Sequence, residues 1–272
     1  MKKIKFTKMV GAGNDFIIIE NVNTNLPGLA RSICQRKTGI GADGMLILDK
    51  IKGSQARMRI FNPDGSEAEM CGNGIRCCAV YMTKRKKLKK KQLTFFTKAG
   101  ILYAECRRDT AKVKMSYPKD LKLDILLDIE PRPVVGNYID TGVPHVVIFV
   151  EGLHTINVKE IGRRIRNHRK FSPRGANVNF VEIIDKNKIK VRTYERGVEN
   201  ETLACGTGAV ASSIVTFFKT VDSTRDKKNI KVNATTLSTD TLLVTFDFMN
   251  KKISNVWLEG EANSIYKGEY YV

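Results

Sequence analysis

Two of the six cysteines stand in the same short sequence pattern. Cys71 and Cys205 each open a Cys-Gly-x-Gly sequence, and a stretch with helical character follows each one, at residues 75–87 and 209–219. A Gly-rich turn at the start of a helix presents unpaired backbone N–H groups and the positive end of the helix dipole. That position suits an anion such as a carboxylate, and it lowers the pKa of a thiol from about 8.5 toward 3.5–7.5. Both cysteines are therefore candidates for thiolate chemistry.

The similarity extends upstream of each cysteine and indicates an internal duplication. An Arg-x-aromatic sequence precedes both cysteines at nearly the same separation, and a glutamate lies four residues ahead of each one. The repeated residues are Arg59, Glu67 and Cys71 in the first half, and Arg192, Glu201 and Cys205 in the second. We predict two halves related by an approximate two-fold axis, with the two Cys-Gly-x-Gly turns facing each other across a cleft.

Two such thiols on opposite sides of one carbon atom could invert that carbon. One cysteine, as thiolate, removes the α-proton of an amino acid, and the other, as thiol, delivers a proton to the opposite face. Backbone donors aimed at the neighbouring carboxylate stabilise the charge that develops there. The pair starts as one thiolate and one thiol, so it titrates as a unit. The pattern thus predicts an amino-acid racemase or epimerase that needs neither a pyridoxal cofactor nor a metal ion.

The other cysteines and the histidines do not suggest a metal site. No cysteine pair has C-x-x-C spacing, and the three histidines are widely scattered. Cys34, Cys77, Cys78 and Cys106 have apolar or helical neighbours, and we expect them to be small buried hydrophobic residues. The charged N-terminus has no signal-peptide pattern, so the cysteines predict free thiols in a reducing cytoplasm.

Composition allows a globular core but leaves the strong positive charge unexplained. Hydrophobic residues make up 42%, and the net charge is +19 with a pI near 9.7. No apolar run approaches the roughly 18 residues that span a membrane. Part of the charge lies in residues 84–91, which we interpret as a solvated helix end or loop. A basic nucleic-acid-binding protein is the alternative from another class, but this run lacks the interleaved aromatic residues that stack on single strands.

Strand-like runs that alternate apolar and polar residues dominate the chain, and helices are few. We predict an α+β fold of two pseudo-symmetric domains, each an antiparallel sheet or barrel curled around a central helix. Further helices are expected at residues 29–36 and 158–167. Prolines cluster between residues 118 and 133, so we expect one domain at 1–117, joined by the tail 261–272, and another at 118–260.

The G-x-G-x-x-G sequence at residues 39–44 does not indicate a dinucleotide-binding site. It follows an expected helix and precedes an expected strand, whereas the dinucleotide-binding motif follows a strand and begins a helix.

Several stretches resemble the diaminopimelate epimerase family. The similarity covers residues 6–16, 61–77 and 194–208, and its most specific part is the string Met70-Cys71-Gly72-Asn73-Gly74-x-Arg76-Cys77. The resemblance implies the interconversion of LL- and meso-diaminopimelate, on the route to lysine and peptidoglycan, with no cofactor.

The resemblance also implies roles for individual residues. Cys71 and Cys205 match the acid–base pair, and His145 and Glu195 match the pair that supports the cysteines and the reacting amino group. The positions that match substrate-binding residues are Asn14, Asn62, Gly72, Asn73, Asn177, Glu195, Arg196, Gly206 and Thr207. Among these, Gly72-Asn73 and Gly206-Thr207 hold the carboxylate at the reacting centre, and Arg196 suits a carboxylate at the distant end.

Two departures from the family affect the predicted substrate. Val143 stands where many relatives have Asn, and Gly44 stands where some have Gln. Loss of a polar contact at the distant end weakens selectivity, so a racemase of another amino acid on the same fold is the main alternative. The expected partner is a small amino-acid substrate, with no membrane and no specific nucleic acid. The sequence is compatible with a homodimer.

Overall fold

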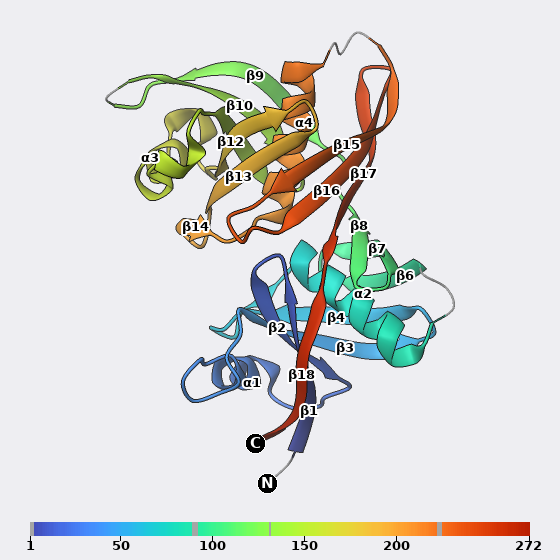
Figure 1. Ribbon diagram of the computed structural model, residues 1–272. Coiled ribbons are helices and arrows are strands. Elements are labelled where there is room, and N and C mark those ends of the chain that lie inside the picture. The colour runs from blue at the N-terminus through green and yellow to red at the C-terminus, as the bar shows by residue number, and fades with distance from the viewer. Residues whose placement is uncertain (1–2, 89–91, 131, 222–224) are drawn as a thin grey trace. The chain divides into compact units, whose positions relative to one another are not determined.

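The computed structural model describes residues 3–88, 92–130, 132–221 and 225–272 (Figure 1). The chain forms two compact units: Met1–Lys114 with Glu259–Val272 (unit 1), and Met115–Leu258 (unit 2). Among the helices in these described ranges, none is long and apolar enough to cross a membrane.

The two units contain the same elements in the same order. Each has two strands, a helix, three strands, a second helix and three further strands. In unit 1 these are β1 (Lys3–Gly11), β2 (Asn14–Glu20), α1 (Leu26–Ile33), β3 (Gly44–Lys52), β4 (Gln55–Phe61), β5 (Glu67–Ala68), α2 (Gly72–Lys86), β6 (Gln92–Thr97), β7 (Gly100–Arg107) and β8 (Thr110–Lys114). The second series is β10 (Val134–Asp140), β11 (Pro144–Phe149), α3 (Val158–Arg166), β12 (Asn177–Asp185), β13 (Lys188–Glu195), β14 (Asn200–Thr202), α4 (Gly206–Thr220), β15 (Lys227–Thr235), β16 (Thr241–Met249) and β17 (Lys252–Glu261). Two short 3-10 helices, Leu153–Thr155 and Arg169–Phe171, flank α3.

Strand pairing repeats as well. Strand β2 is parallel to β3, as β11 is to β12, and β4 is parallel to β6, as β13 is to β15. The antiparallel pair β3–β4 likewise corresponds to β12–β13. The predicted α+β fold of two pseudo-symmetric halves is confirmed, and its sheets contain these parallel pairs in addition to the antiparallel ones.

One strand outside each repeat completes each unit. Strand β18 (Asn263–Tyr271), at the end of the chain, pairs antiparallel with β1 in unit 1. Strand β9 (Lys119–Leu127) pairs in the same way with β10 in unit 2. The proline-containing region in which we expected a boundary therefore contains a paired strand, and the chain passes from unit 1 to unit 2 between Lys114 and Met115.

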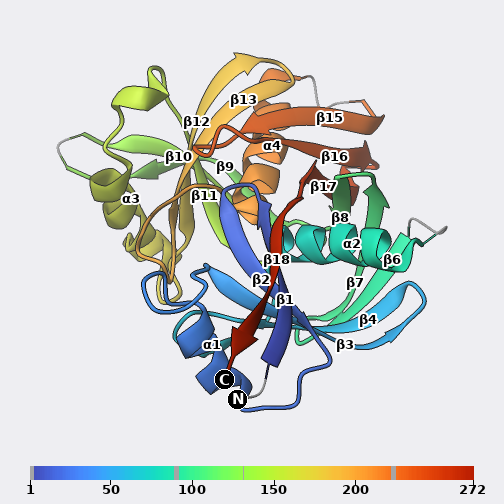
Figure 2. The same cartoon turned by 60° about the horizontal axis from the view of Figure 1, so that its bottom comes forward.

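Helices α2 and α4 are the central helices. Helix α2 contacts β1, β2, β3, β7, β8 and β18, and α4 contacts β10, β11, β12, β13, β15 and β16. Each helix lies among the strands of its own unit in both views (Figures 1 and 2). Every residue from Gly208 to Phe217 in α4 is buried. A helix that is buried on all sides needs a sheet that curves around it, which is the arrangement predicted from sequence.

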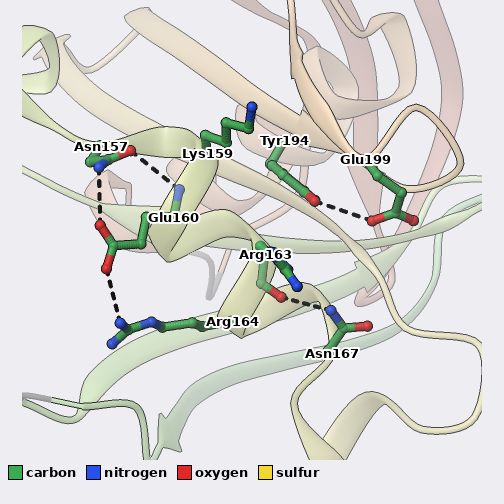
Figure 3. Close-up of a pocket in the computed structure, with 8 residues that line it drawn as sticks. All are labelled: Asn157, Lys159, Glu160, Arg163, Arg164, Asn167, Tyr194 and Glu199. Atoms are coloured by element: carbon green, nitrogen blue, oxygen red, sulfur yellow. Dashed lines mark hydrogen bonds and ion pairs between the residues drawn. The ribbon is translucent and has the colours of Figure 1, made fainter.

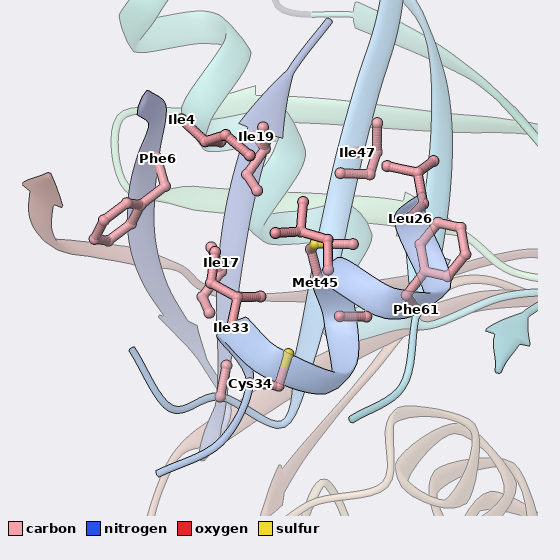
Figure 4. Close-up of a cluster of buried hydrophobic side chains, with 13 residues drawn as sticks. Ile4, Phe6, Ile17, Ile19, Leu26, Ile33, Cys34, Met45, Ile47 and Phe61 are labelled. Carbon is pink, nitrogen blue, oxygen red and sulfur yellow. The ribbon is translucent and has the colours of Figure 1, made fainter. Parts of the chain in front are cut away.

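Helices α1 and α3 cover the outer side of the strands. In unit 1, Leu26 and Ile33 of α1 pack on Ile17, Met45 and Phe61, which come from β2, β3 and β4 (Figure 4). In unit 2, Val158 and Ile165 of α3 join the corresponding cluster, which includes Tyr194. The two aromatic residues of the sequence repeat, Phe61 and Tyr194, thus belong to the same layer of their units.

The basic run begins at the end of α2. Lys84 and Arg85 are exposed, and Lys87 caps the helix in a left-handed conformation with φ 48°. This agrees with the prediction of a solvated helix end as far as residue 88, and residues 89–91 lie outside the described ranges.

Candidate active site

Cys71 caps the N-terminus of α2. Its backbone is extended (φ −147°, ψ 110°), and its Sγ atom accepts a hydrogen bond from the backbone N–H of Gly74 at 3.4 Å. Gly72 and Asn73 are the first two helical residues, so their N–H groups belong to the set that has no partner within the helix. A negative charge on this sulfur is stabilised by the capping N–H and by the helix dipole.

Cys205 occupies the same position in unit 2. It caps α4 with a similar extended backbone (φ −121°, ψ 111°), and Gly206 and Thr207 begin the helix. Its Sγ atom lies 3.4 Å from Oγ1 of Thr207. The hydroxyl of Thr141 donates to the backbone carbonyl of Thr207 at 3.1 Å, which ties this first turn to the strand region before β11. Both repeats therefore seat a thiol where a central helix begins.

In unit 1, a chain of side-chain hydrogen bonds connects Asn73 and Asn14. The amide NH₂ of Asn73 donates to Oδ1 of Asn14 at 2.7 Å, and the amide NH₂ of Asn14 donates to Oδ2 of Asp43 at 3.0 Å. The buried guanidinium of Arg76 donates to Oδ1 of Asn73 at 2.7 Å. Arg36 binds the other oxygen of Asp43 at 2.7 Å. These contacts fix the orientation of both asparagine amides beside the turn that carries Cys71.

Asn62 lies apart from this chain, in the turn after β4. Its amide NH₂ donates to Oγ of Ser66 at 3.0 Å, and its backbone N–H donates to the carbonyl of Ser66 at 2.9 Å. The side chain is exposed. Because the NH₂ group is held by Ser66, the carbonyl oxygen of the Asn62 amide is the end that faces a ligand most readily.

In unit 2, the remaining predicted residues gather at one end of three neighbouring strands. His145 at the start of β11 pairs with Asn177 at the start of β12, and Glu195 ends β13. Oδ1 of Asn177 accepts a hydrogen bond from the backbone N–H of Arg196 at 2.7 Å. The amide NH₂ of Asn177 is therefore the end that can meet a carboxylate.

The carboxylate of Glu195 is largely buried. Burial raises its pKa above the usual range, although the hydrogen bond that Oε2 accepts from Thr202 at 3.1 Å opposes this shift. The guanidinium of Arg196 reaches the carbonyl of Arg174 at 3.3 Å. Glu195 and Arg196 thus place one negative and one positive group in adjacent positions at the end of β13.

His145 is buried completely. Burial lowers its pKa to about 3, and the positive charge of Arg196 acts in the same direction. Its Nδ1 atom lies 3.1 Å from Nδ2 of Asn179. Its Nε2 atom is also buried, and within the described part of the chain it has no hydrogen-bond partner.

The four cysteines outside the repeat are buried, as expected. Burial raises the pKa of Cys34 to about 11 and that of Cys77 to about 12, and it raises the pKa of Cys78 well above its usual value. These three groups therefore stay as thiols near neutral pH.

A surface pocket beside α3 contains none of the predicted residues. Its lining residues are Asn157, Lys159, Glu160, Arg163, Arg164, Asn167, Tyr194 and Glu199 (Figure 3). Several of them bind one another: Arg164 to Glu160 at 2.9 Å, and the hydroxyl of Tyr194 to Glu199 at 3.2 Å. Among the described residues, this pocket has no cysteine in its lining, and several of its charged and polar groups are already paired with one another.

Several residues in these hydrogen-bond networks were given no role from sequence, among them Asp43, Arg76 and Asn179. Thr193 is another, and its hydroxyl donates to Oδ1 of Asn179 at 3.0 Å. A signal for the last two exists, because Asn177, Asn179 and Thr193 are polar residues at buried positions of strands that are otherwise apolar. Buried polar groups of this kind are uncommon without a partner or a ligand.

Comparison with known proteins agrees with these features. The family model described as diaminopimelate epimerase matches residues 6–119 and 137–243. A diaminopimelate epimerase of Methanocella arvoryzae is 41% identical over 99% of this chain and 97% of its own, and one of Aquifex aeolicus is 38% identical over 97% of each chain. Among solved structures, a Bacillus anthracis phenazine biosynthesis protein of the PhzF family aligns with a TM-score of 0.75 at 19% identity, covering 100% of both chains. A probable proline racemase from Agrobacterium radiobacter K84 aligns with a TM-score of 0.72 at 13% identity, covering 99% of this chain and 92% of that one. The two solved structures show the fold that this chain shares with them.

Proposed function

The chain belongs to the diaminopimelate epimerase family, and we propose that it interconverts LL- and meso-diaminopimelate by proton transfer between two cysteines, without a cofactor. The observation that carries this proposal is the equivalent position of Cys71 and Cys205, each the N-cap of the central helix in its repeat. Such a pair of activated thiols supplies the two groups that inversion at carbon requires.

The mechanism requires both helix starts to reach the same substrate. The thiolate of one cysteine takes the α-proton, and the electron pair of the broken C–H bond passes into the neighbouring carboxylate. The thiol of the other cysteine then gives its proton to the opposite face of the carbon. The products are the inverted amino acid and a cysteine pair with thiol and thiolate exchanged, ready for the reverse reaction.

Backbone donors at the two helix starts stabilise the charge that forms. The N–H groups of Gly72 and Asn73 in one unit, and of Gly206 and Thr207 in the other, are those that have no partner within the helix. They would hold the carboxylate next to the reacting carbon, where negative charge grows as the proton leaves. Donors placed in advance at such a point are commonly the largest contribution to catalysis.

The other polar groups suit the two ammonium and two carboxylate groups of diaminopimelate. Glu195 would accept a hydrogen bond from the reacting ammonium, with His145 beside it. The guanidinium of Arg196 and the amide NH₂ of Asn177 would bind the distant carboxylate. The carbonyl of Asn62 would accept from the distant ammonium, and the network of Asn14 and Asn73 would position the first helix turn.

Three further statements stay predictions of this proposal. The protein is expected in the cytoplasm, it takes a small amino acid as its partner, and a homodimer is an assembly that sedimentation can test.

Neither Val143 nor Gly44 supplies a polar side chain at the positions where relatives differ. The distant end of the substrate would therefore be held chiefly by the groups named above.

A direct test compares amino acids as substrates. Purified protein is incubated with LL-diaminopimelate, L-glutamate, L-lysine or L-proline, and products are separated by chiral chromatography. Formation of meso-diaminopimelate alone is expected. If the protein inverts one of the other amino acids and leaves diaminopimelate unchanged, diaminopimelate is not the substrate and that amino acid takes its place in the proposal. If the protein inverts none of these four amino acids, its assignment as an epimerase acting on them is refuted.

A further inference from the structure

Asn179 lies in the interior of unit 2, on β12 and beside the first turn of α4. Its Oδ1 atom accepts a hydrogen bond from the hydroxyl of Thr193 at 3.0 Å. Its Nδ2 atom donates to the backbone carbonyl of Val146 at 3.2 Å and faces Nδ1 of His145 at 3.1 Å. All of these atoms belong to strands β11, β12 and β13.

The contacts determine which way the amide of Asn179 points. A backbone carbonyl can only accept a hydrogen bond, so the end of the amide that faces Val146 must be the NH₂ group. The same nitrogen faces His145, and an amide nitrogen only donates. Nδ1 of His145 must therefore accept with its lone pair. In a neutral imidazole the proton then resides on Nε2.

This polar cluster is specific to the second repeat. In unit 1, Ile17 pairs with Met45 and Met45 with Phe61, as Val146 pairs with Val178 and Val178 with Tyr194 in unit 2. By this register, the unit 1 residues that correspond to His145, Asn179 and Thr193 are Phe16, Leu46 and Ile60. The fold is thus built with an apolar cluster at this place in one repeat, and polar groups here call for a separate explanation.

The remaining donor of the cluster points to a ligand. Nε2 of His145 is buried and, among the described residues, has no partner. A buried donor without a partner destabilises the fold, and a bound acceptor would recover that loss. His145 pairs across the sheet with Asn177, whose Oδ1 atom accepts from the backbone N–H of Arg196 and whose NH₂ group we assign to substrate binding.

We propose that Asn179 is a positioning residue that holds His145 as the neutral tautomer with its proton on Nε2. His145 then donates a hydrogen bond to an oxygen of the bound amino acid and does not itself take the α-proton. The identity of this ligand rests on the proposed function, whereas the tautomer is a property of the protein alone.

The tautomer can be measured by NMR on the full-length protein labelled with ¹⁵N-histidine. The chain has three histidines, so the variants His154→Gln and His168→Gln suffice to assign the signals. We expect His145 to show a neutral ring with the proton on Nε2 at about pH 6 to 8. A proton on Nδ1, or a charged ring in this range, would overturn the proposal.

Variants of Asn179 test what the tautomer does. Asn179→Leu introduces the residue found at the corresponding place in unit 1, and Asn179→Asp offers Nδ1 an acceptor instead of a donor. Both should shift the proton toward Nδ1 and lower kcat by about 10- to 100-fold, the range found when the group that orients a metal-binding histidine is removed. KM should change much less.

A buried polar residue elsewhere in unit 2 provides the control. The hydroxyl of Thr216 donates to the carbonyl of Ser212 within the same helix α4, so Thr216→Val should keep both the tautomer and kcat. A folded Asn179→Asp or Asn179→Leu protein with a changed tautomer and unchanged kcat would refute the positioning role. If the wild type shows the expected tautomer but inverts no diaminopimelate, the proposed function fails and the tautomer assignment stands.

Discussion

Gly208 packs directly against the buried amide of Asn179. A β-carbon at Gly208 would lie 2.3 Å from Oδ1 of Asn179, closer than two such atoms can approach. At the corresponding place in unit 1, a β-carbon at Gly74 would lie 3.2 Å from a methyl group of Leu46. The second glycine of each Cys-Gly-x-Gly turn thus lets a central helix begin close to the sheet, but only in unit 2 does it rest on a hydrogen-bonded side chain.

Gly208→Ala should destabilise the protein more than Gly74→Ala. Asn179 is held by hydrogen bonds and cannot move aside without breaking them, so we expect a loss of about 1–3 kcal/mol for Gly208→Ala. At Gly74 the methyl group of Leu46 can shift, and alanine favours the helix by up to about 1 kcal/mol, so the net change should be small. Urea unfolding of both variants measures the difference. Equal losses would contradict this view of the helix start.

Acid should destabilise the fold through His145. Its pKa falls from 6.5 to about 3 on folding, because burial disfavours the charged ring. Below about pH 6.5 the unfolded chain binds a proton that the folded protein excludes, and the resulting loss of stability grows until about pH 3. The loss amounts to about 2 kcal/mol at pH 5.

The test compares unfolding free energies of the wild type and His145→Gln at pH 7.5 and pH 5. The variant should lose about 2 kcal/mol less than the wild type between these two values. Parallel losses in both proteins would show that other groups account for the acid sensitivity.

Asn177→Asp should weaken substrate binding. Its carboxylate can still accept from the backbone N–H of Arg196, but it replaces the NH₂ donor by an oxygen that repels the distant carboxylate of the substrate. We expect KM to rise by about 10-fold or more while kcat changes less, since the contact is the same in ground and transition states. Asn62→Asp is the matched control, because that side chain presents its oxygen already. Steady-state kinetics that show equal rises in KM would contradict the two orientations.

Cys71→Ser and Cys205→Ser should each abolish most activity. A serine hydroxyl ionises far less readily than a thiol, so loss of general acid–base catalysis should lower kcat by about 100-fold or more. Circular dichroism should be unchanged, since serine is also a good N-cap. Cys34→Ala is the control: this thiol is buried with a pKa of about 11, and the variant should keep normal turnover. Near-normal turnover in either serine variant would refute the two-cysteine scheme.

The positions of the central helices could be predicted, but not their first turns. Helices α2 and α4 begin at Gly72 and Gly206, three residues before the starts expected from apolar spacing. Their first turns consist of Gly, Asn and Thr, which carry no apolar periodicity. Helix α1 begins at Leu26 rather than at residue 29, because Asn25 caps it and Pro27 fits the first turn. Capping residues, not hydrophobic residues, mark these boundaries.

Several strands could not be recognised because their stability comes from distant partners. Strands β9 and β18 are largely exposed, and each is held by pairing with the first strand of a repeat. The parallel pairs likewise depend on crossover connections: β2–β3 and β11–β12 are connected through α1 and α3, and β4–β6 and β13–β15 through α2 and α4. A short sequence window contains no information on such partners.

The site residues could be predicted from the sequence repeat and the family motif. The hydrogen-bond network around His145 could not, because strand register brings its members together. Asn179 contacts His145 only because β11 and β12 run parallel with His145 opposite Asn177. Thr193 joins them because it pairs with Asn179 across β12 and β13. Each is an ordinary polar residue in the sequence, and the register alone brings them together.

The distribution of deuterium early in the reaction tests the central claim most directly. Protein and LL-diaminopimelate are mixed in heavy water, and the reaction is stopped before it reaches equilibrium. The remaining substrate and the meso product are then separated, and mass spectrometry measures the deuterium content of each. If one cysteine removes the proton and the other supplies one from solvent, the product carries one deuterium from the first turnovers while the remaining LL substrate carries none. Meso product that retains the original hydrogen would show a single group acting on both faces, and would contradict the two-cysteine account.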